Sequence, residues 1–278
     1  MTVLLFTIIV FAGAFAAGTI GSLSGLGGGI IIIPLLSIGL GVDIHYAIGA
    51  ALVSVIATSS GSAAAYVREG ITNMRLGIFL EIATTFGAVS GALIASIAPG
   101  SLIAVLFGLT LIFSSINSLR KKEEHLLTSS SPLAQKLKLN GSYPDENGKQ
   151  TVYGTKNVLG GFGMMGLAGM MSGLLGIGSG AFKVIAMDNI MKIPFKVSTT
   201  TSNFMMGVTA IASTVIYLQK GYIQPAICMP TMIGVLFGSM TGSRILLRSN
   251  PQKLRLFFAI LILLLAINMI YNGFAGKI

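Results

Sequence analysis

Long apolar runs with few charges recur along this chain of 278 residues. A helix needs roughly 20 residues to cross about 30 Å of hydrocarbon, so such runs are typical of membrane-spanning helices. Only 9% of the residues are charged, whereas an average soluble domain has about 25%, so the chain cannot cover a water-soluble particle with polar groups. Eight runs are long enough to span a bilayer: Thr2–Ile20, Tyr46–Val67, Leu76–Ala98, Leu102–Leu119, Val158–Leu175, Val197–Leu218, Ile223–Leu247 and Leu254–Phe274.

Two shorter apolar runs, Ile30–Leu40 and Ala181–Met191, each follow a glycine-rich break. The ten runs together predict an all-α polytopic protein of about ten membrane segments, placed in the cell (plasma) membrane with lipid as its partner. A secretory signal peptide is not expected, because the first ten residues carry no charge and the first run reads as a membrane helix.

One long polar stretch separates the two sets of runs. We expect residues 1–119 to form a first membrane unit, 120–157 a linker and 158–278 a second membrane unit. Within the linker, Leu137–Tyr143 and Gln150–Tyr153 flank turn-forming residues, which favours a small solvent-exposed hairpin. A disordered tether is the alternative interpretation of the linker.

The two membrane units repeat at a fixed offset. Gly25–Gly29 (GLGGG) is followed 151 residues later by Gly176–Gly180 (GIGSG). Random apolar sequence would match Leu and Ile at this spacing, but not a series of Gly, Thr, Ser and Tyr. The same gapless offset pairs Thr58 with Thr209, Ser62 with Ser213, Tyr66 with Tyr217, Gly70 with Gly221, Gly87 with Gly238 and Gly91 with Gly242.

The basic residues predict how the two units are oriented. The net charge is +10, from 18 Lys and Arg against 8 Asp and Glu, and Lys and Arg near helix ends favour the cytoplasm. Five crossings per unit, with the linker inside, leave two basic residues outside (Lys220 and Lys277) and eight inside: Arg68, Arg75, Lys192, Lys196, Arg244, Arg248, Lys253 and Arg255. Four crossings would give parallel units with six outside and four inside. We therefore predict an inverted repeat with a cytoplasmic linker and both termini outside.

The two glycine-rich breaks are candidate anion sites. A helix N-terminus exposes unpaired N–H groups and carries about half a positive charge, which suits an anion. We expect the breaks to approach each other near mid-membrane, with substrate contacts at Gly27, Gly28, Gly29, Gly178, Ser179 and Gly180. The alternative is that these glycines only permit close helix packing.

The second unit supplies most of the predicted polar lining. Where the first unit has Ala47–Leu52, the second has Ser198–Asn203, and we expect the side chains of Thr201, Ser202 and Asn203 to donate hydrogen bonds to a substrate. Lys183 needs a reason to lie in an apolar run, since a mid-helix charge costs on the order of 3 kcal/mol. It could contact the anion or pair with Asp188.

Two acidic residues are possible coupling sites for an ion that moves with the substrate. Glu81 could carry a proton, and the alternative is that it is a solvated residue near the cytoplasmic end of its helix. Asp188 is the second such residue. Asp43 and His45, in a loop expected outside, are interpreted as surface residues.

Several of these motifs resemble one family. GLGGGIIIIP at Gly25–Pro34 is similar to the first signature of the sulfite exporter TauE/SafE family, and Gly173–Asn203 is similar to its second signature. The likeness continues through Tyr217–Pro225 and Gly234–Leu247. The resemblance implies a transporter of small sulfur-containing anions such as sulfite or organosulfonates. Ser179 departs from the family pattern by replacing the middle Gly of the second triplet, and Ile185 departs from the repeat by standing where the first unit has Pro34.

Functions other than transport of small sulfur-containing anions are less well supported by the sequence. An enzyme is not expected, because both His residues fall in polar loops and no Cys, His and carboxylate cluster has metal-ligand spacing; accordingly we expect no cofactor and no metal. Nucleic acid is not an expected partner, and a homo-oligomer is possible. The remaining alternatives are a ten-segment drug/metabolite-type carrier for another organic anion and a non-transporting assembly factor.

A transport mechanism follows from the predicted repeat. The two halves would rock about the bound anion and expose it to each side in turn. With a negative cell interior, moving one anionic charge outward gains roughly 2.3 kcal/mol per 100 mV. We therefore expect voltage-dependent export without a coupled proton.

Overall fold

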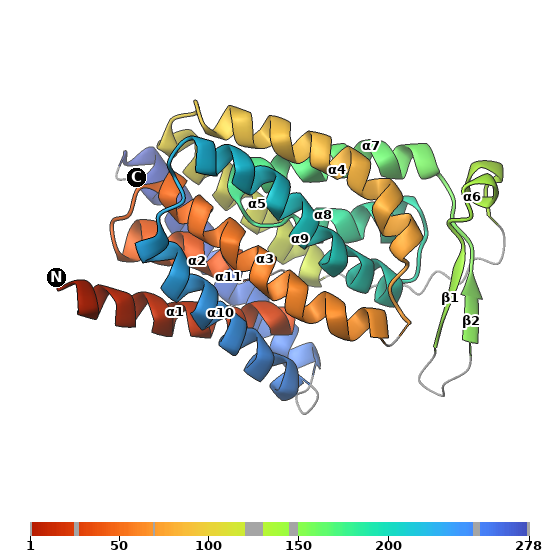
Figure 1. Ribbon diagram of the computed structural model, residues 1–278, viewed down its shortest axis with the longest axis horizontal. Coiled ribbons are helices and arrows are strands. Elements are labelled where there is room, and N and C mark those ends of the chain that lie inside the picture. Colours follow the sequence, from red (N-terminus) through yellow and green to blue (C-terminus); the bar gives the residue numbers. More distant parts are fainter. Residues whose placement is uncertain are drawn as a thin grey trace.

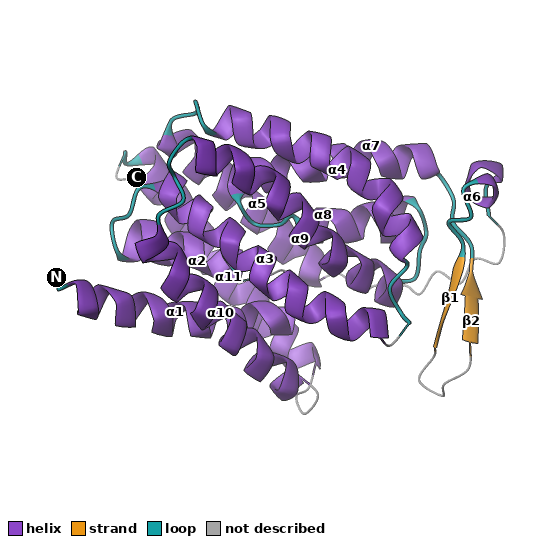
Figure 2. Ribbon diagram, viewed as in Figure 1, coloured by secondary structure: helices purple, strands orange, loops and turns teal. Residues whose placement is uncertain are grey.

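A computed structural model describes residues 2–24, 28–68, 70–119, 130–144, 150–246 and 251–276 of the chain. It is mostly helical, at 79%, and Figures 1 and 2 show an elongated helical bundle with a small hairpin at one end. The helical bundle agrees with the class of fold predicted from the apolar runs.

The helices of the first unit begin and end close to the predicted runs. They are α1 (Val3–Ser24), α2 (Gly29–Pro34) with its π-helical continuation η1 (Leu35–Gly39), α3 (Ile44–Arg68), α4 (Met74–Ala95) and α5 (Gly100–Leu119). Asn73 caps α4, because its side chain accepts a hydrogen bond from the Leu76 N–H.

The second unit repeats this order of elements. It contains α7 (Val158–Leu175), α8 (Gly180–Ile185) with η2 (Ala186–Ile190), α9 (Phe195–Gln219), α10 (Pro225–Leu246) and α11 (Pro251–Phe274). Gly70 after α3 and Gly221 after α9, which the offset pairs, both have positive φ, of 68° and 76°. Glycine adopts this left-handed conformation without steric cost, so the matched glycines end matched helices in the same way.

The described part of the linker is folded. It contains α6 (Pro132–Lys136) and an antiparallel hairpin of β1 (Gly141–Pro144) and β2 (Gln150–Tyr153), in which Gly141 pairs with Tyr153. The predicted pairing of two strands is therefore confirmed, but the first strand begins at Gly141 and not at Leu137, and Tyr143 and Tyr153 are buried and not solvent-exposed. The turn residues 145–149 and the segment 120–129 lie outside the described residues.

Membrane-spanning capacity is distributed over several helices. Among the described residues, α1, α4, α5, α7 and α9 are long and apolar enough to cross a bilayer. α3, α10 and α11 contain shorter apolar stretches at Ile44–Ser60, Pro225–Thr241 and Ala259–Phe274. Large apolar side chains such as Phe86 and Leu159 are exposed on the helix surfaces, as expected where lipid is the solvent.

The helices of the two units pack in matching pairs. α1 packs along α10, and α7, the counterpart of α1, packs along α4, the counterpart of α10. A Cβ on Gly87 would overlap the carbonyl oxygen of Gly166, and one on Gly238 would overlap that of Phe15. The two contacts are related by the repeat: Gly238 lies 151 residues after Gly87, and Gly166 lies 151 residues after Phe15. The internal repeat of the sequence is thus a repeat of helix contacts.

The α3–α4 turn and the start of α9 contact the hairpin at one end of the bundle. At the hairpin end, the Asn73 side chain donates to the Leu139 carbonyl and to the Tyr153 hydroxyl, and Lys196 donates to the carbonyl of Pro144. The N-terminal end of α1 and the C-terminal end of α11 lie at the opposite end (Figure 1).

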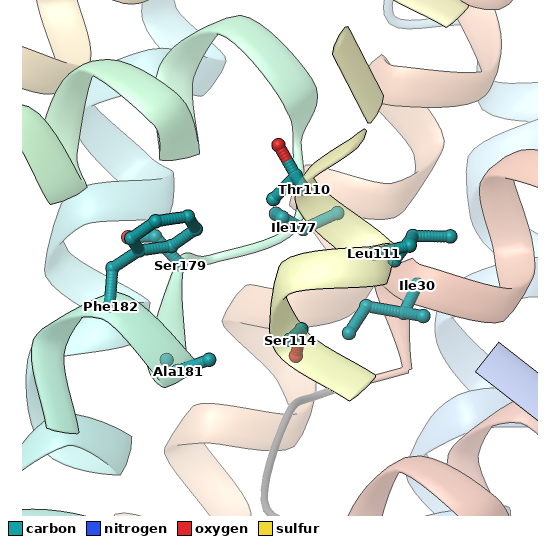
Figure 3. A pocket seen from close by; sticks show the side chains of 9 residues that line it. Ile30, Thr110, Leu111, Ser114, Ile177, Ser179, Ala181 and Phe182 are labelled. Carbon is teal, nitrogen blue, oxygen red and sulfur yellow. The ribbon is translucent and has the colours of Figure 1, made fainter. Parts of the chain in front are cut away.

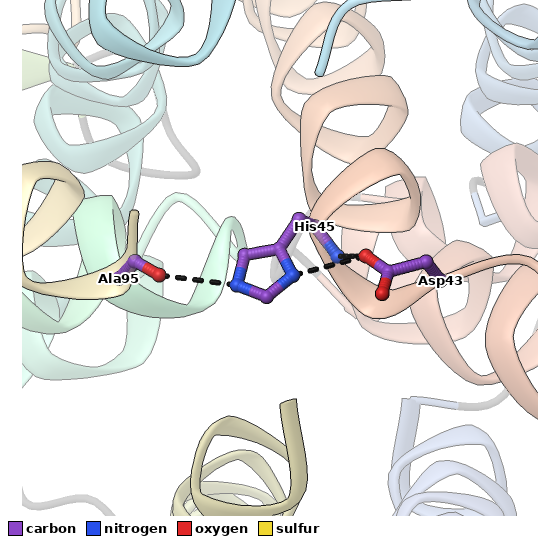
Figure 4. A network of polar contacts seen from close by, with 3 residues as sticks. All are labelled: Asp43, His45 and Ala95. Carbon is purple, nitrogen blue, oxygen red and sulfur yellow. Dashed lines mark hydrogen bonds and ion pairs between the residues drawn. The ribbon is translucent and has the colours of Figure 1, made fainter. Parts of the chain in front are cut away.

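A polar cluster lies where α3 begins and α4 ends. His45 faces the Asp43 carboxylate and the Ala95 carbonyl with its two ring nitrogens, at 2.9 Å and 3.2 Å (Figure 4). Its ring also stacks on Tyr222 of the α9–α10 turn. Asp43 is at the surface as expected, but His45 is largely buried, because its ring packs between two other turns.

Candidate functional site

The second glycine-rich break has an unusual backbone. Gly176 and Gly178 have φ of 70° and 68°, and Ser179, which immediately precedes α8, has φ of 45°. A non-glycine residue in this region is uncommon and is a sign of a local constraint, because its Cβ crowds the backbone. The break therefore turns the chain sharply between α7 and α8 at the cost of strain at Ser179.

The two breaks lie side by side. A Cβ placed on Gly29, the first residue of α2, would be 3.0 Å from the carbonyl oxygen of Gly176. Gly28, which precedes α2, has an ordinary helical backbone with φ of −68°, unlike its counterpart Ser179. Gly27 of the predicted anion site lies outside the described residues. Glycine at position 29 thus allows the start of α2 to approach the second break closely.

A small pocket lies between the starts of α2 and α8 and the middle of α5. Figure 3 shows Leu111 of α5 pointing toward Ile30, with Thr110 and Ser114 of the same helix also lining the pocket. The hydroxyl groups of Ser114 and Ser179 are both buried without a hydrogen-bond partner. The other lining residues are Ile30, Ile177, Gly180, Ala181 and Phe182.

Sequence reasoning did not select the α5 residues of this pocket. Thr110 and Ser114 stand in an ordinary apolar run, with no glycine break and no charge beside them. Their only signal is the spacing of four residues, which places two hydroxyl groups on one face of a helix. That pattern recurs in many membrane helices and does not distinguish a site.

Lys183 is completely buried and is held by two other helices. Its ammonium nitrogen donates to the Thr209 hydroxyl of α9 at 2.5 Å, and this hydroxyl donates to Oε1 of Glu81 on α4 at 2.6 Å. Thr209 is also fully buried. The structure thus brings Lys183 together with Glu81, a pairing that sequence reasoning missed.

Glu81 is not the solvated residue that one interpretation of the sequence expected. Its exposed fraction is 7%, because α4 packs between α7 and α9 over this turn. Oε2 of Glu81 has no hydrogen-bond partner, although the side chains of Thr84 and Thr85 lie beside the carboxyl group. Asp188 is likewise buried, at 3% exposed, in η2.

The predicted hydroxyl and amide donors of α9 have different surroundings. Thr201 accepts a hydrogen bond from the Asn73 N–H, and Ser202 donates to the carbonyl of Gly180 at 3.3 Å. The carbonyl of Asn203 accepts from the Ser59 hydroxyl of α3, whereas its side-chain amide has no partner among the described residues. Ser202 therefore adjoins the start of α8, Asn203 joins α9 to α3, and Thr201 joins α9 to the α3–α4 turn.

The helices, the paired breaks and the buried polar groups define a polytopic α-helical membrane protein of the transporter class. A model of one family, described as sulfite exporter TauE/SafE, matches residues 10–269. The chain therefore belongs to the sulfite exporter TauE/SafE family and is a membrane transporter of that family.

Curated relatives support this assignment along nearly the whole chain. The chain is 27% identical over 276 residues to the probable membrane transporter protein YunE of Bacillus subtilis, covering 96% of this chain and 98% of the relative. It is 25% identical over 272 residues to the probable membrane transporter protein MJ0441 of Methanocaldococcus jannaschii, with 92% of each chain covered. No solved structure matches the chain significantly. Membership of a transporter family is consistent with the expectation that the chain is not an enzyme.

Proposed function

We propose that the chain exports small sulfur-containing anions, such as sulfite or organosulfonates, as a secondary transporter with alternating access. The observation that carries this proposal is Lys183. An ammonium group has three donors, and Thr209 is the one acceptor for this fully buried group among the described residues. Two unused donors on a buried cation suit an oxyanion, which offers several acceptors and a negative charge.

The surroundings of Lys183 support an oxyanion as ligand. Ser179 lies one helical turn before it, and the Lys183 N–H bonds to the Ser179 carbonyl at 3.1 Å. A strained serine with an unpaired buried hydroxyl is costly to the fold, and such costs cluster at functional sites. The hydroxyl of Ser114 on α5 lines the small pocket beside Ser179, which Lys183 itself does not line. Sulfite and sulfonate groups accept hydrogen bonds from several directions, as these donors require.

Contacts at the two ends support the predicted inverted repeat with ten crossings. The turn before α9 contacts the linker, since Lys156 N–H bonds to the Met191 carbonyl and Lys196 bonds to Pro144. Five crossings per unit place this turn on the linker side, whereas four crossings would place it on the other side. Tyr222 stacks on His45 at the end where both are expected outside. The breaks would then enter from opposite leaflets and form one central site.

A binding and flux experiment tests the proposed function. Purified protein is titrated with sulfite, thiosulfate, sulfate and methanesulfonate, and the bound anions are then used in proteoliposome flux. The double variant Lys183→Met with Glu81→Gln removes both buried charges without leaving one unpaired, and we expect it to lose anion binding at least tenfold. The exposed Lys156→Ala serves as the matched control. Unchanged binding in the double variant would contradict the proposal, and preferential flux of an unrelated organic anion would favour the alternative carrier.

A further inference from the structure

The buried lysine and glutamate are joined through a single hydroxyl group. No direct ion pair within 4 Å links Lys183 to Glu81 in the part of the chain that the structure describes; Thr209 lies between them. A hydroxyl has one proton to donate. A protonated Lys183 donates to the Thr209 hydroxyl, and this hydroxyl lies within hydrogen-bonding distance of two acceptors, Oε1 of Glu81 at 2.6 Å and the carbonyl of Met205 at 2.9 Å. With its proton directed at Oε1 of Glu81, Thr209 links a charged lysine to an ionised glutamate.

Both ends of this chain of hydrogen bonds have donors or acceptors without a partner. Lys183 retains two N–H donors, as described above, and Oε2 of Glu81 has no partner. A proton added to Oε2 would leave the bond between Thr209 and Oε1 intact. The cluster can therefore accept an anion at one end and a proton at the other without rearranging Thr209.

We propose that Glu81 takes up one proton on Oε2 whenever an anion binds to Lys183. This inference rests on the proposed function. The empty cluster carries one positive and one negative charge, and a monovalent anion would leave a net negative charge in a buried site. Uncompensated buried charge is strongly unfavourable. A proton from the aqueous phase converts the carboxylate into a neutral acid and restores neutrality, and no other bond forms or breaks.

Glu81 and Asp188 of η2 are the buried acidic groups among the described residues, and Glu81 is the one that Thr209 joins to Lys183. Lys183 is the charged group that lies against its carboxyl group. The neighbouring helix α7 contains no titratable residue, and Lys196 of α9 is directed toward Pro144 and the Tyr143 ring. On α4 itself, Arg75 is exposed.

Proton uptake changes the energetics of transport. One monovalent anion and one proton would move together without net charge. The flux would then follow the anion gradient and the pH difference, and the membrane potential would contribute nothing. This differs from the voltage-driven, proton-independent export expected from the sequence, because that expectation considered only the charge of the anion.

Binding at several pH values tests the linkage directly. Methanesulfonate stays monovalent across the range, so any pH dependence belongs to the protein. We expect wild-type affinity to fall up to tenfold per pH unit above the titration of Glu81, the limit for one linked proton. Glu81→Gln should bind with an affinity that no longer depends on pH. Glu81→Asp keeps a titratable group and should retain the dependence, as should Asp188→Asn.

The possible failures have different meanings. Failure of the wild type to bind any anion of the panel contradicts the proposed function itself. Anion binding whose pH dependence persists in Glu81→Gln contradicts only the inference, and loss of the dependence in Asp188→Asn instead would move the proton to Asp188. In proteoliposomes, methanesulfonate flux that responds to membrane potential but not to a pH difference would also overturn it. Elution as a single species confirms that each variant is folded.

Discussion

Ser179 combines backbone strain with an unpaired buried hydroxyl. Gly28, its counterpart in the first unit, has helical φ, so the repeat does not impose a left-handed serine. In the second unit, Ser179 has a side chain although its backbone adopts the left-handed conformation that favours glycine. The two breaks therefore differ in backbone conformation at matched positions.

Substitution of Ser179 separates the strain from the hydroxyl. Ser179→Ala and Ser179→Gly both remove the hydroxyl, but only glycine relieves the positive φ. We expect the glycine variant to be more stable than the alanine variant by about 1 kcal/mol in thermal unfolding. Anion affinity should fall equally in both variants. Wild-type affinity in both would mean that the hydroxyl does not contact substrate.

Two glycines of α7 provide a matched test of helix packing. A Cβ on Gly173 would overlap the carbonyl oxygen of Ala88 on α4, whereas nothing lies within 4 Å of one on Gly163. We expect Gly173→Ala to lower the free energy of unfolding by about 1–3 kcal/mol, because α4 and α7 must separate. Gly163→Ala should be neutral or slightly stabilising. Equal thermal stabilities for the two variants would contradict this close approach.

Among the elements, the hairpin is a packed part of the fold. Asn73 connects it to the membrane helices, because one side chain caps α4 and also donates to Leu139 and Tyr153. Burial raises the pKa of Tyr153 to about 12, so its hydroxyl stays protonated at physiological pH. The contact between linker and bundle is therefore insensitive to pH in that range.

Removal of the Tyr153 hydroxyl should loosen the hairpin. Tyr153→Phe deletes one acceptor of Asn73, which costs about 1 kcal/mol, and we expect faster amide hydrogen exchange over residues 137–144 and 150–157. Val152→Thr is the control on the same strand, since Val152 is 65% exposed. Exchange as slow in Tyr153→Phe as in the control would show that the hairpin docks without this bond.

For the whole molecule, the orientation of the two repeats in the membrane can be tested by cysteine labelling. Met74 and Gln224 are exposed at the starts of α4 and α10, which the repeat pairs. We expect cysteines at these two positions, in a Cys228→Ser background, to react with an impermeant maleimide from opposite sides. Val152→Cys in the hairpin should react from the same side as Met74→Cys. Labelling of Met74→Cys and Gln224→Cys from one side would exclude an inverted repeat.

The helices, the two breaks, the hairpin and the repeat could be predicted from the amino-acid sequence alone. These features are local: apolar length sets a membrane helix, glycine ends it, and the fixed offset is visible by direct comparison of residues. Even Lys183 was identified as exceptional, because a charge in an apolar run has a cost wherever it lies. The family resemblance was confirmed for the same reason, since its motifs are contiguous.

The side-chain contacts between different helices became apparent only from the tertiary structure. The sequence did not pair Glu81 with Lys183, and the two belong to different units of the repeat, yet Thr209 joins them across three helices. Helix packing likewise brings Ser114 of α5 into the pocket beside Ser179. Such contacts depend on how α4, α8 and α9 pack, and helix packing is set by close approach of small residues from both units. Sequence periodicity describes the face of one helix and does not name the partner against which that face is buried.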